Sequence, residues 1–221
     1  MKYSFILLLI TGLLITSCGD SGKEAKTGEA QKVEATGSKD DMPYTFLDPS
    51  SHIEWSATHL GGVNKRFGKV QLAGAKALAN EKSITQAKAV IDLKTLTVES
   101  FPEGSEQKGQ LTEHLKSDDF FDVAKFPTAE FELTSVAPGE GGFNSNVTGN
   151  LTIKGVTKSI TFPANITITP EALTLDSAPF TVDRSDWGLT YHRKGTVGVP
   201  VDYLISDDIG FTIHLKLKQG N

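Results

Sequence analysis

Apolar and polar residues alternate with a period of two through most of the chain from Tyr44 onward. Near the C-terminus, for example, Ile209, Phe211 and Ile213 are separated by small or polar residues. Because successive side chains of a strand point to opposite faces, this period predicts β-strands with one apolar and one polar face, as in antiparallel sheets. Comparable alternation runs through residues 87–93, 129–133, 147–153 and 160–168.

Breaks that contain glycine or proline separate these segments, and only one stretch has a different period. Leu111 and Leu115 lie at helical spacing within residues 110–121, which predicts a short helix between two strands that ends before Pro127. The adjacent Phe120 and Phe121 either dock this helix or cap an interior space. About eight strands with one-sided patterning need a shared core, so we predict an all-β fold, a single antiparallel eight-stranded barrel. A two-layer sandwich is the alternative.

The apolar strand faces carry small residues in mid-strand, and these bear on whether the barrel is filled or hollow. Small residues that face inward leave room along the axis for one apolar chain. They equally fit the taper of a barrel that side chains fill completely, so their spacing alone does not decide between the two. The residues are Ala57, Ala89, Ala129, Gly149 and Ala164.

The N-terminal region has the features of an exported lipoprotein. Lys2 precedes an apolar run at residues 5–15 that is too short to span a bilayer and suits a signal peptide. The run ends in Ile15-Thr16-Ser17-Cys18, which resembles the bacterial lipobox. We therefore predict a lipoprotein signal peptide at residues 1–17 and lipidation of Cys18; an ordinary cleaved signal is the alternative. Cys18 is the only cysteine, so no disulfide can form within the chain.

Residues 19–42 contain no aromatic residue, leucine or isoleucine. Such a stretch buries too little apolar area to offset its conformational entropy. We expect residues 18–42 to be a lipidated cysteine followed by a disordered tether, and residues 43–221 to form the barrel domain. The net charge of −5 gives the chain no general attraction for nucleic acid or anionic headgroups, so membrane attachment is expected to come from the lipid.

The polar residues do not indicate catalysis or a metal centre. The five histidines are scattered along the sequence, and no pair has metal-ligand spacing. Asp183, Asp186 and His192 could act as acids or bases, but no nucleophile elbow or Ser-His-Asp order accompanies them. We therefore expect no enzyme, no cofactor and no metal.

Four motifs, in order and spanning residues 44–217, together resemble the YceI-like family of polyisoprenoid-binding proteins. They are residues 115–131 (LKSDDFFDVAKFPTAEF), residues 149–158 (GNLTIKGVTK), residues 184–189 (RSDWGL), and His59 followed by Phe67-Gly68. The chain departs from the family pattern at Trp187, where phenylalanine is usual, and at residues 110–113. The resemblance implies a lipocalin-like barrel with a hydrophobic tunnel, export from the cytoplasm and no cofactor chemistry. It favours the hollow alternative.

On this basis we expect the tunnel to be lined by large apolar side chains with small residues between them. The expected lining is Trp55, Phe67, Ala89, Ile91, Phe131, Leu133, Gly149, Leu151, Phe162, Ala164, Ile166, Phe180, Trp187, Phe211 and Ile213. A pyrophosphate headgroup would need cationic donors at the tunnel mouth, because a guanidinium presents a planar fork to phosphate. The candidates are Arg184, His192, Arg193 and His59; a structural ion-pair network around Arg184 is the alternative.

The sequence thus predicts a protein that binds a long-chain apolar lipid, such as a polyisoprenoid or a quinone-like amphiphile, as a carrier or buffer in the cell envelope. The alternatives are a structural or surface-interaction barrel without a ligand, and an enzyme that acts on a lipid. Expected partners are the lipid and, through Cys18, the membrane, with no nucleic acid; a homodimer is compatible with the sequence. Gly19 follows Cys18 where aspartate would indicate retention in the inner membrane, so we expect a periplasm-facing protein on the outer membrane.

Overall fold

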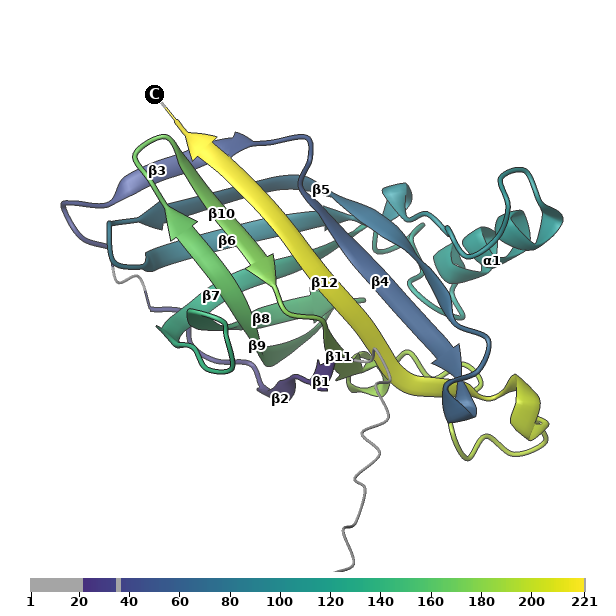
Figure 1. Ribbon diagram of the computed structural model, residues 1–221. Helices are drawn as coiled ribbons and strands as arrows, with labels where there is room; N and C mark the ends of the chain where they lie inside the picture. Colours follow the sequence, from purple (N-terminus) through teal and green to yellow (C-terminus); the bar gives the residue numbers. More distant parts are fainter. Residues whose placement is uncertain (1–21, 35–36, 221) are drawn as a thin grey trace, which may run out of the picture.

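Eight antiparallel strands close into a ring in the computed structural model, which describes residues 22–34 and 37–220 (Figure 1). The ring consists of β4 (His52–His59), β5 (Arg66–Ala79), β6 (Ile84–Asp92), β7 (Thr128–Pro138), β8 (Ser145–Ile153), β9 (Val156–Ile168), β10 (Ala172–Ser177) and β12 (Ile205–Gln219). In this order each strand pairs with its successor, and β12 pairs with β4 to close the ring. The predicted eight-stranded antiparallel barrel is therefore confirmed, and the sandwich alternative is excluded.

Two shorter strands lengthen the ring at opposite ends of the long strand β12. At its C-terminal end, β3 (Met42–Leu47) pairs with both β12 and β5. At the other end, β11 (Phe180–Asp183) pairs with residues 208–211 of β12. Short 3-10 helices cover Leu60–Gly62, Leu93–Thr95, Arg184–Trp187 and Val201–Tyr203.

The predicted helix is present as α1 (Glu106–Lys116), and it begins four residues earlier than the apolar spacing indicated. The side chain of Ser105 accepts a hydrogen bond from the Lys108 amide and so caps the first turn. Gly109 lies within the helix, and a turn follows it and carries Phe120 and Phe121. Among the described residues, no helix combines the length and apolar character that a membrane crossing needs.

Two strands form inside the segment that was expected to be a disordered tether. β1 (Lys23–Glu24) runs parallel to β11, and β2 (Lys26–Glu29) runs antiparallel to residues 158–161 of β9. Beyond them, the Gln31 amide donates to Asn150 Oδ1 (2.8 Å), and the Asn150 amide donates back to the Gln31 carbonyl (2.7 Å). The tether prediction is therefore wrong for residues 23–31.

Main-chain pairing explains why residues 23–31 are ordered. Residues 158–161 of β9 pair with β8 on one edge, but β10 pairs with β9 only as far as Ala164, so their other edge would otherwise be unpaired. The edge of β11 that faces away from β12 would be unpaired as well. The free N–H and C=O groups of an unpaired strand edge can bond to the backbone of almost any extended segment, whatever its side chains. Within residues 22–34 only Ala25 is buried, so side-chain burial contributes little to this docking. The predicted signal peptide and Cys18 lie outside the described residues.

The interior differs between the two ends of the barrel. At the end nearest β3, side chains fill the space: Ala79 and Ala164 have no exposed surface, and the Tyr44 hydroxyl donates to the Thr169 carbonyl (2.6 Å). Toward the middle, aromatic rings form a floor, in which Phe162 stacks on Phe180 with a centroid distance of 4.7 Å. Phe131 and Phe211 flank this pair at centroid distances of 5.9 Å and 6.0 Å. The barrel is thus packed on one side of the floor.

Candidate functional site

A cavity of about 120 Å³ lies on the other side of the aromatic floor. Its floor includes Phe131, Phe180 and Phe211, and its roof includes Phe120 and Phe121 from the turn after α1. The remaining wall consists of inward-facing residues of the strands, of the segment after β6, of α1 and of the 3-10 helix Arg184–Trp187. These are Ile53, Trp55, Ala57, Val70, Ile91, Leu93, Leu96, Leu115, Ala129, Leu151, Ile153, Ile160, Arg184, Ile205, Ile209 and Ile213.

The structure brings together about half of the residues predicted to line a tunnel. Those that line the cavity are Trp55, Ile91, Phe131, Leu151, Phe180, Phe211 and Ile213. Sequence reasoning did not place Leu115 and the two phenylalanines of the roof in the lining, and it also missed residues of the strands and of the segment after β6. These are Ile53, Val70, Leu93, Leu96, Ile153, Ile160, Ile205 and Ile209. Docking of the helix and capping of the interior were considered as alternatives for Phe120 and Phe121, and the structure shows that one arrangement does both.

Other predicted lining residues are buried without facing the cavity. Leu133, Phe162, Ala164 and Trp187 belong to the packed core, with at most 5% of their surface exposed. The Trp187 indole donates to the Leu151 carbonyl (3.0 Å), which orients the ring within the wall. The three strand residues, Leu133, Phe162 and Ala164, face inward as the alternation predicted, but Phe162 belongs to the floor and the other two lie beside or below it. The period of a strand gives the direction of a side chain and not its height along the barrel axis.

Three of the small or partly exposed positions also fall outside the cavity lining, for different reasons. The space beside Gly149 is taken by Phe131, because a Cβ built on Gly149 would lie 2.2 Å from the tip of that ring. Ala89 and Ile166 are half-buried and do not contribute to the cavity wall. The expectation that Gly149 and Ala164 line free volume is therefore wrong.

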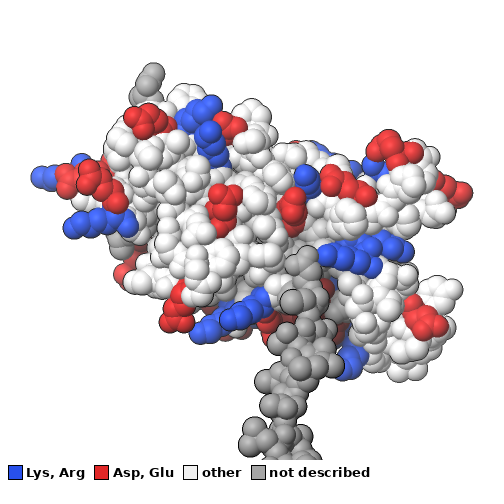
Figure 2. Space-filling view, viewed as in Figure 1, with Lys and Arg blue, Asp and Glu red and all other residues white. Residues whose placement is uncertain are grey.

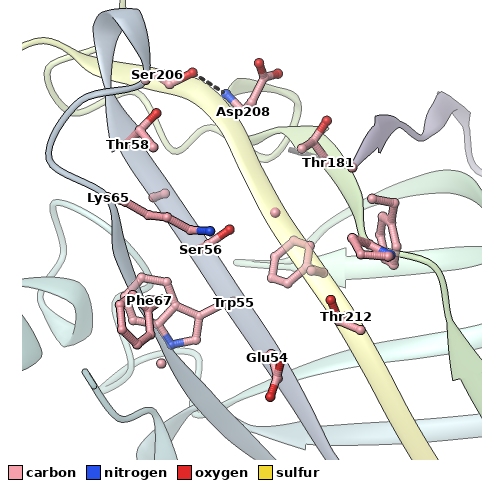
Figure 3. A pocket seen from close by; sticks show the side chains of 18 of the residues that line it. Glu54, Trp55, Ser56, Thr58, Lys65, Phe67, Thr181, Ser206, Asp208 and Thr212 are labelled. Carbon is pink, nitrogen blue, oxygen red and sulfur yellow. Dashed lines mark hydrogen bonds between the residues drawn. The ribbon is translucent and has the colours of Figure 1, made fainter. Parts of the chain in front are cut away.

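Phe67 faces the opposite way from its prediction and lies on the outer wall, 43% exposed. Its neighbour Gly68 faces inward, where a Cβ would meet the Thr97 carbonyl oxygen at 1.9 Å. Phe67 instead borders an open outer groove of about 1020 Å³, shown in Figure 3 with Ser56 and Lys65. Trp55 contributes to both this groove and the cavity, and its indole donates to the Thr97 carbonyl (3.0 Å).

The roof of the cavity is joined to the chain after β11 by a cluster of rings. His114 on α1 meets Phe120 edge-on at a centroid distance of 5.0 Å and Tyr191 at 4.6 Å. Tyr191 in turn stacks on His192 at 3.9 Å. Ring packing thus joins α1 and the turn after it to the chain after β11, and Lys154 Nζ also donates to the Asp118 carbonyl of that turn (3.0 Å). His192, a candidate for headgroup contact, takes part in this closure.

Arg184, the leading headgroup candidate, is 1% exposed and bonded to the main chain. Its Nη1 donates to the Leu189 carbonyl (2.6 Å), its Nε to the Ser206 carbonyl (3.0 Å) and its Nη2 to the Ile205 carbonyl (3.3 Å). Nη2 also lies 3.6 Å from Asp207 Oδ1. Burial lowers the pKa of the Arg184 guanidinium, and the Asp207 carboxylate opposes that shift. This geometry favours the structural ion-pair interpretation over a headgroup clamp.

The other two candidates lie near the end of the barrel opposite β3, where the loop after β4 meets the chain before β12. Arg193, whose side chain is 42% exposed, places Nη2 at 3.6 Å from Asp207 Oδ2, so Asp207 lies between two guanidinium groups. His59 ends β4, and its Nδ1 lies 2.7 Å from the Asp202 carbonyl. Neither residue lines the cavity. Any contact they make with a ligand would therefore be made outside the cavity.

Comparison with known proteins matches the sequence profile of the YceI-like domain to residues 44–217. A UPF0312 protein of Shewanella denitrificans is 34% identical over 119 residues, and one of Pseudomonas putida is 36% identical over 118 residues. Each match covers 51% of this chain, and the chain spans about half the length of these relatives, 55% and 54% respectively.

Two solved structures share the fold at low sequence identity. BcnA of Burkholderia cenocepacia matches with a TM-score of 0.56 and 21% identity, over 77% of this chain and 98% of BcnA. A polyisoprenoid binding domain from Saccharophagus degradans, implicated in plant cell wall breakdown, matches with a TM-score of 0.55 and 16% identity, over 81% of this chain and 99% of that domain. Because the profile covers well over half of the chain, the protein belongs to the YceI-like domain family.

Proposed function

We propose that the protein binds the apolar chain of a long lipid, of the polyisoprenoid or quinone-like class, and acts as a carrier or buffer in the cell envelope rather than as an enzyme. The cavity between the aromatic floor and the roof carries this proposal. Among the described residues of its wall, Arg184 is the only charged one, and its guanidinium is bonded to main-chain carbonyls. Such a wall offers burial to a hydrocarbon chain and few hydrogen bonds to a polar ligand. The polyisoprenoid binding domain of Saccharophagus degradans has the same fold, which supports this choice of lipid.

The size of the cavity sets how the lipid enters. Cavities of comparable volume accommodate a benzene-sized group, so about 120 Å³ suits roughly one five-carbon isoprene unit. A longer chain has to displace a wall. The roof is the segment to move, because the turn that carries Phe120 and Phe121 belongs to no strand. It is held by the packing of the Phe120 ring and by hydrogen bonds such as that from Lys154 Nζ to the Asp118 carbonyl. In this proposal the first isoprene unit occupies the existing cavity, and the rest of the chain replaces the roof.

The loop after β4 and the segment before β12, which meet at the end of the barrel opposite β3, support loading from a bilayer. They expose Val63 (54%), Val197 (97%), Val201 (66%) and Tyr203 (63%), and the Leu60 amide donates to the Leu204 carbonyl (2.9 Å) to join them. Exposed apolar residues with a tyrosine suit the interface of a bilayer. Local cations would complement anionic headgroups although the whole chain is acidic. These are Lys65, Arg66, Arg193 and Lys194.

Elsewhere the charges are mixed. Figure 2 shows lysine and arginine interspersed with aspartate and glutamate on one face of the molecule, so net charge is not gathered there.

Lipidation of Cys18 would supply the membrane anchor. Because Gly22 packs against Pro179 beside β11, four residues of extended chain allow at most about 15 Å between anchor and barrel. We propose a barrel held close to the membrane on the periplasmic side, with the outer membrane as its location.

Extraction of the purified full-length protein with organic solvent, followed by mass spectrometry, tests the proposed function. An isoprenoid or quinone mass at near one molecule per chain is the expected result. Chemical conversion of added polyprenol would indicate an enzyme instead. If nothing is extracted and added polyprenol does not bind, the barrel is a module without a ligand. Cys18→Ala should leave the extracted lipid unchanged and release the protein from washed membranes; a variant that remains in the membrane pellet would contradict the anchor.

A further inference from the structure

Two of the five histidines meet on the outer wall of the barrel. His52 of β4 and His214 of β12 are direct cross-strand partners, with ring centroids 5.0 Å apart. Glu54 lies two residues along β4 on the same face, and its Oε1 is 3.7 Å from His52 Nε2. One potential ligand atom from each of the three residues lies within 4.8 Å of the other two. The neighbouring Ile53 and Ile213 face the cavity, so this cluster faces outward.

Hydrogen bonds fix the orientation of both imidazole rings. His52 Nδ1 lies 2.8 Å from the Ser50 carbonyl oxygen, and because a carbonyl only accepts, Nδ1 carries the proton. His214 Nδ1 lies 2.8 Å from Asp176 Oδ1, and an ionised carboxylate imposes the same tautomer. In each neutral ring the lone pair is therefore on Nε2. Metal-binding histidines typically donate the other ring N–H to a carbonyl or carboxylate in this way, which aligns the ring and strengthens it as a ligand.

We propose that His52, His214 and Glu54 bind a divalent transition-metal ion of the zinc class on the outer wall of the barrel. Two imidazoles and one carboxylate form a ligand set that zinc adopts where a fourth position stays open. Imidazole nitrogen disfavours calcium and magnesium, which prefer oxygen ligands. The side chains of the three residues are 23%, 40% and 47% exposed, respectively, so an ion can reach them from solvent.

Two neighbours bear on this site. Lys69 Nζ lies 3.7 Å from Glu54 Oε1, and the ion would replace this exposed ammonium as the partner of the carboxylate. Glu54 also borders the outer groove shown in Figure 3, so the proposed site lies beside that groove. From the sequence we expected no metal, because the histidines are far apart in the chain. The register of β4 against β12 brings two of them together.

Calorimetric titration of the tag-free full-length protein with zinc chloride, in a buffer that does not chelate metals, tests the proposal. We expect one zinc ion per chain, with no competition from magnesium at millimolar concentration. His214→Gln should raise the dissociation constant for zinc at least tenfold. Asp176→Asn, which retains all three ligands, should raise it by roughly 10- to 100-fold because the ring loses its orienting carboxylate.

His59→Gln is the matched control, since this histidine lies on the same strand and outside the cluster; it should leave the dissociation constant for zinc within about twofold of wild type. Circular dichroism and melting temperature confirm that the surface variants fold. Wild-type protein without saturable binding below 100 µM zinc would overturn the proposal, as would equal losses in His59→Gln and His214→Gln. Polyprenol affinity should be unchanged in His214→Gln, so failure of the metal site leaves the lipid proposal intact.

Discussion

Replacing Ala129 with leucine should block lipid binding without destabilising the barrel. Ala129 is 5% exposed and lines the cavity, whose volume of about 120 Å³ suits a six-carbon ring. Leucine adds three carbon atoms and so takes up about half of that space. A ligand would lose burial of about three methylene groups at about 0.8 kcal/mol each. The expected loss is about 2.4 kcal/mol, or roughly 60-fold in the dissociation constant for a polyprenol.

Ala164→Leu is the matched control, because it adds the same atoms on the packed side of the floor. Ala164 has no exposed surface and does not border the cavity. Overpacking there should cost about 1–3 kcal/mol, which lowers the melting temperature by roughly 2–12 °C. Polyprenol affinity should change little. The Ala129 variant should melt at or slightly above the wild-type temperature, because filling a cavity stabilises.

Polyprenol titration and thermal melting of both purified variants test whether the lipid chain binds in the cavity beside Ala129. Two results would refute the reasoning: a lower melting temperature for Ala129→Leu comparable with that of Ala164→Leu, or wild-type polyprenol affinity in Ala129→Leu. Either would mean that the volume beside Ala129 is not where the lipid chain binds.

Three further predictions concern other parts of the molecule. Arg184→Gln should cost about 3–5 kcal/mol of stability, because it removes the buried guanidinium that faces Asp207 and bonds three main-chain carbonyls. Wild-type affinity of the refolded variant for both prenyl alcohol and prenyl pyrophosphate would fit, whereas a selective loss of affinity for the pyrophosphate would restore the headgroup role. Asn150→Ala should speed hydrogen exchange at Gln31 at least tenfold by removing the two hydrogen bonds that the Gln31 main chain makes with the Asn150 side chain, and unprotected exchange at Gln31 in the wild type would contradict docking of the N-terminal segment. The Ser50 amide, the Lys218 ammonium and the Ser50 hydroxyl hold the pKa of the Asp48 carboxyl well below its usual range; its stabilising contribution should therefore be complete above about pH 4 and be lost as the pH falls below it, so that urea unfolding at pH 7 and pH 3 differs less in Asp48→Asn than in wild type.

The sequence was sufficient for the strands and their faces, because alternation reports directly on which side chains face the interior. It could not give height along the barrel axis, so Phe131 and Ala164 looked equivalent although one borders the cavity and the other is in the packed end. The prediction that Gly149 lines free volume failed for a related reason, because a neighbouring ring can fill the space that a small residue leaves. Each of these facts depends on register, which period-two patterning leaves undetermined.

The two largest differences between the predictions from the sequence and the structure arise from pairing of strands that are far apart in the chain. The composition of residues 23–31 indicates little burial of side chains, and it contains no information on main-chain bonds to β9 and β11. Likewise His52 and His214 become neighbours only through the pairing of β4 with β12. By contrast, the sequence did raise a role for Phe120 and Phe121 in closing the interior, because two adjacent aromatic residues after a short helix can pack over the end of a barrel. It could not decide between this role and docking of the helix.

Photocrosslinking with a diazirine-bearing polyprenol tests the central claim most directly, because peptide mass spectrometry then identifies the residues that contact the chain. We predict label on the cavity walls, at Phe131 and Leu151 of β7 and β8 and at Phe211 and Ile213 of β12, and loss of that label in Ala129→Leu. Label confined to the outer wall around Phe67, or unchanged by Ala129→Leu, would contradict lipid binding in the cavity.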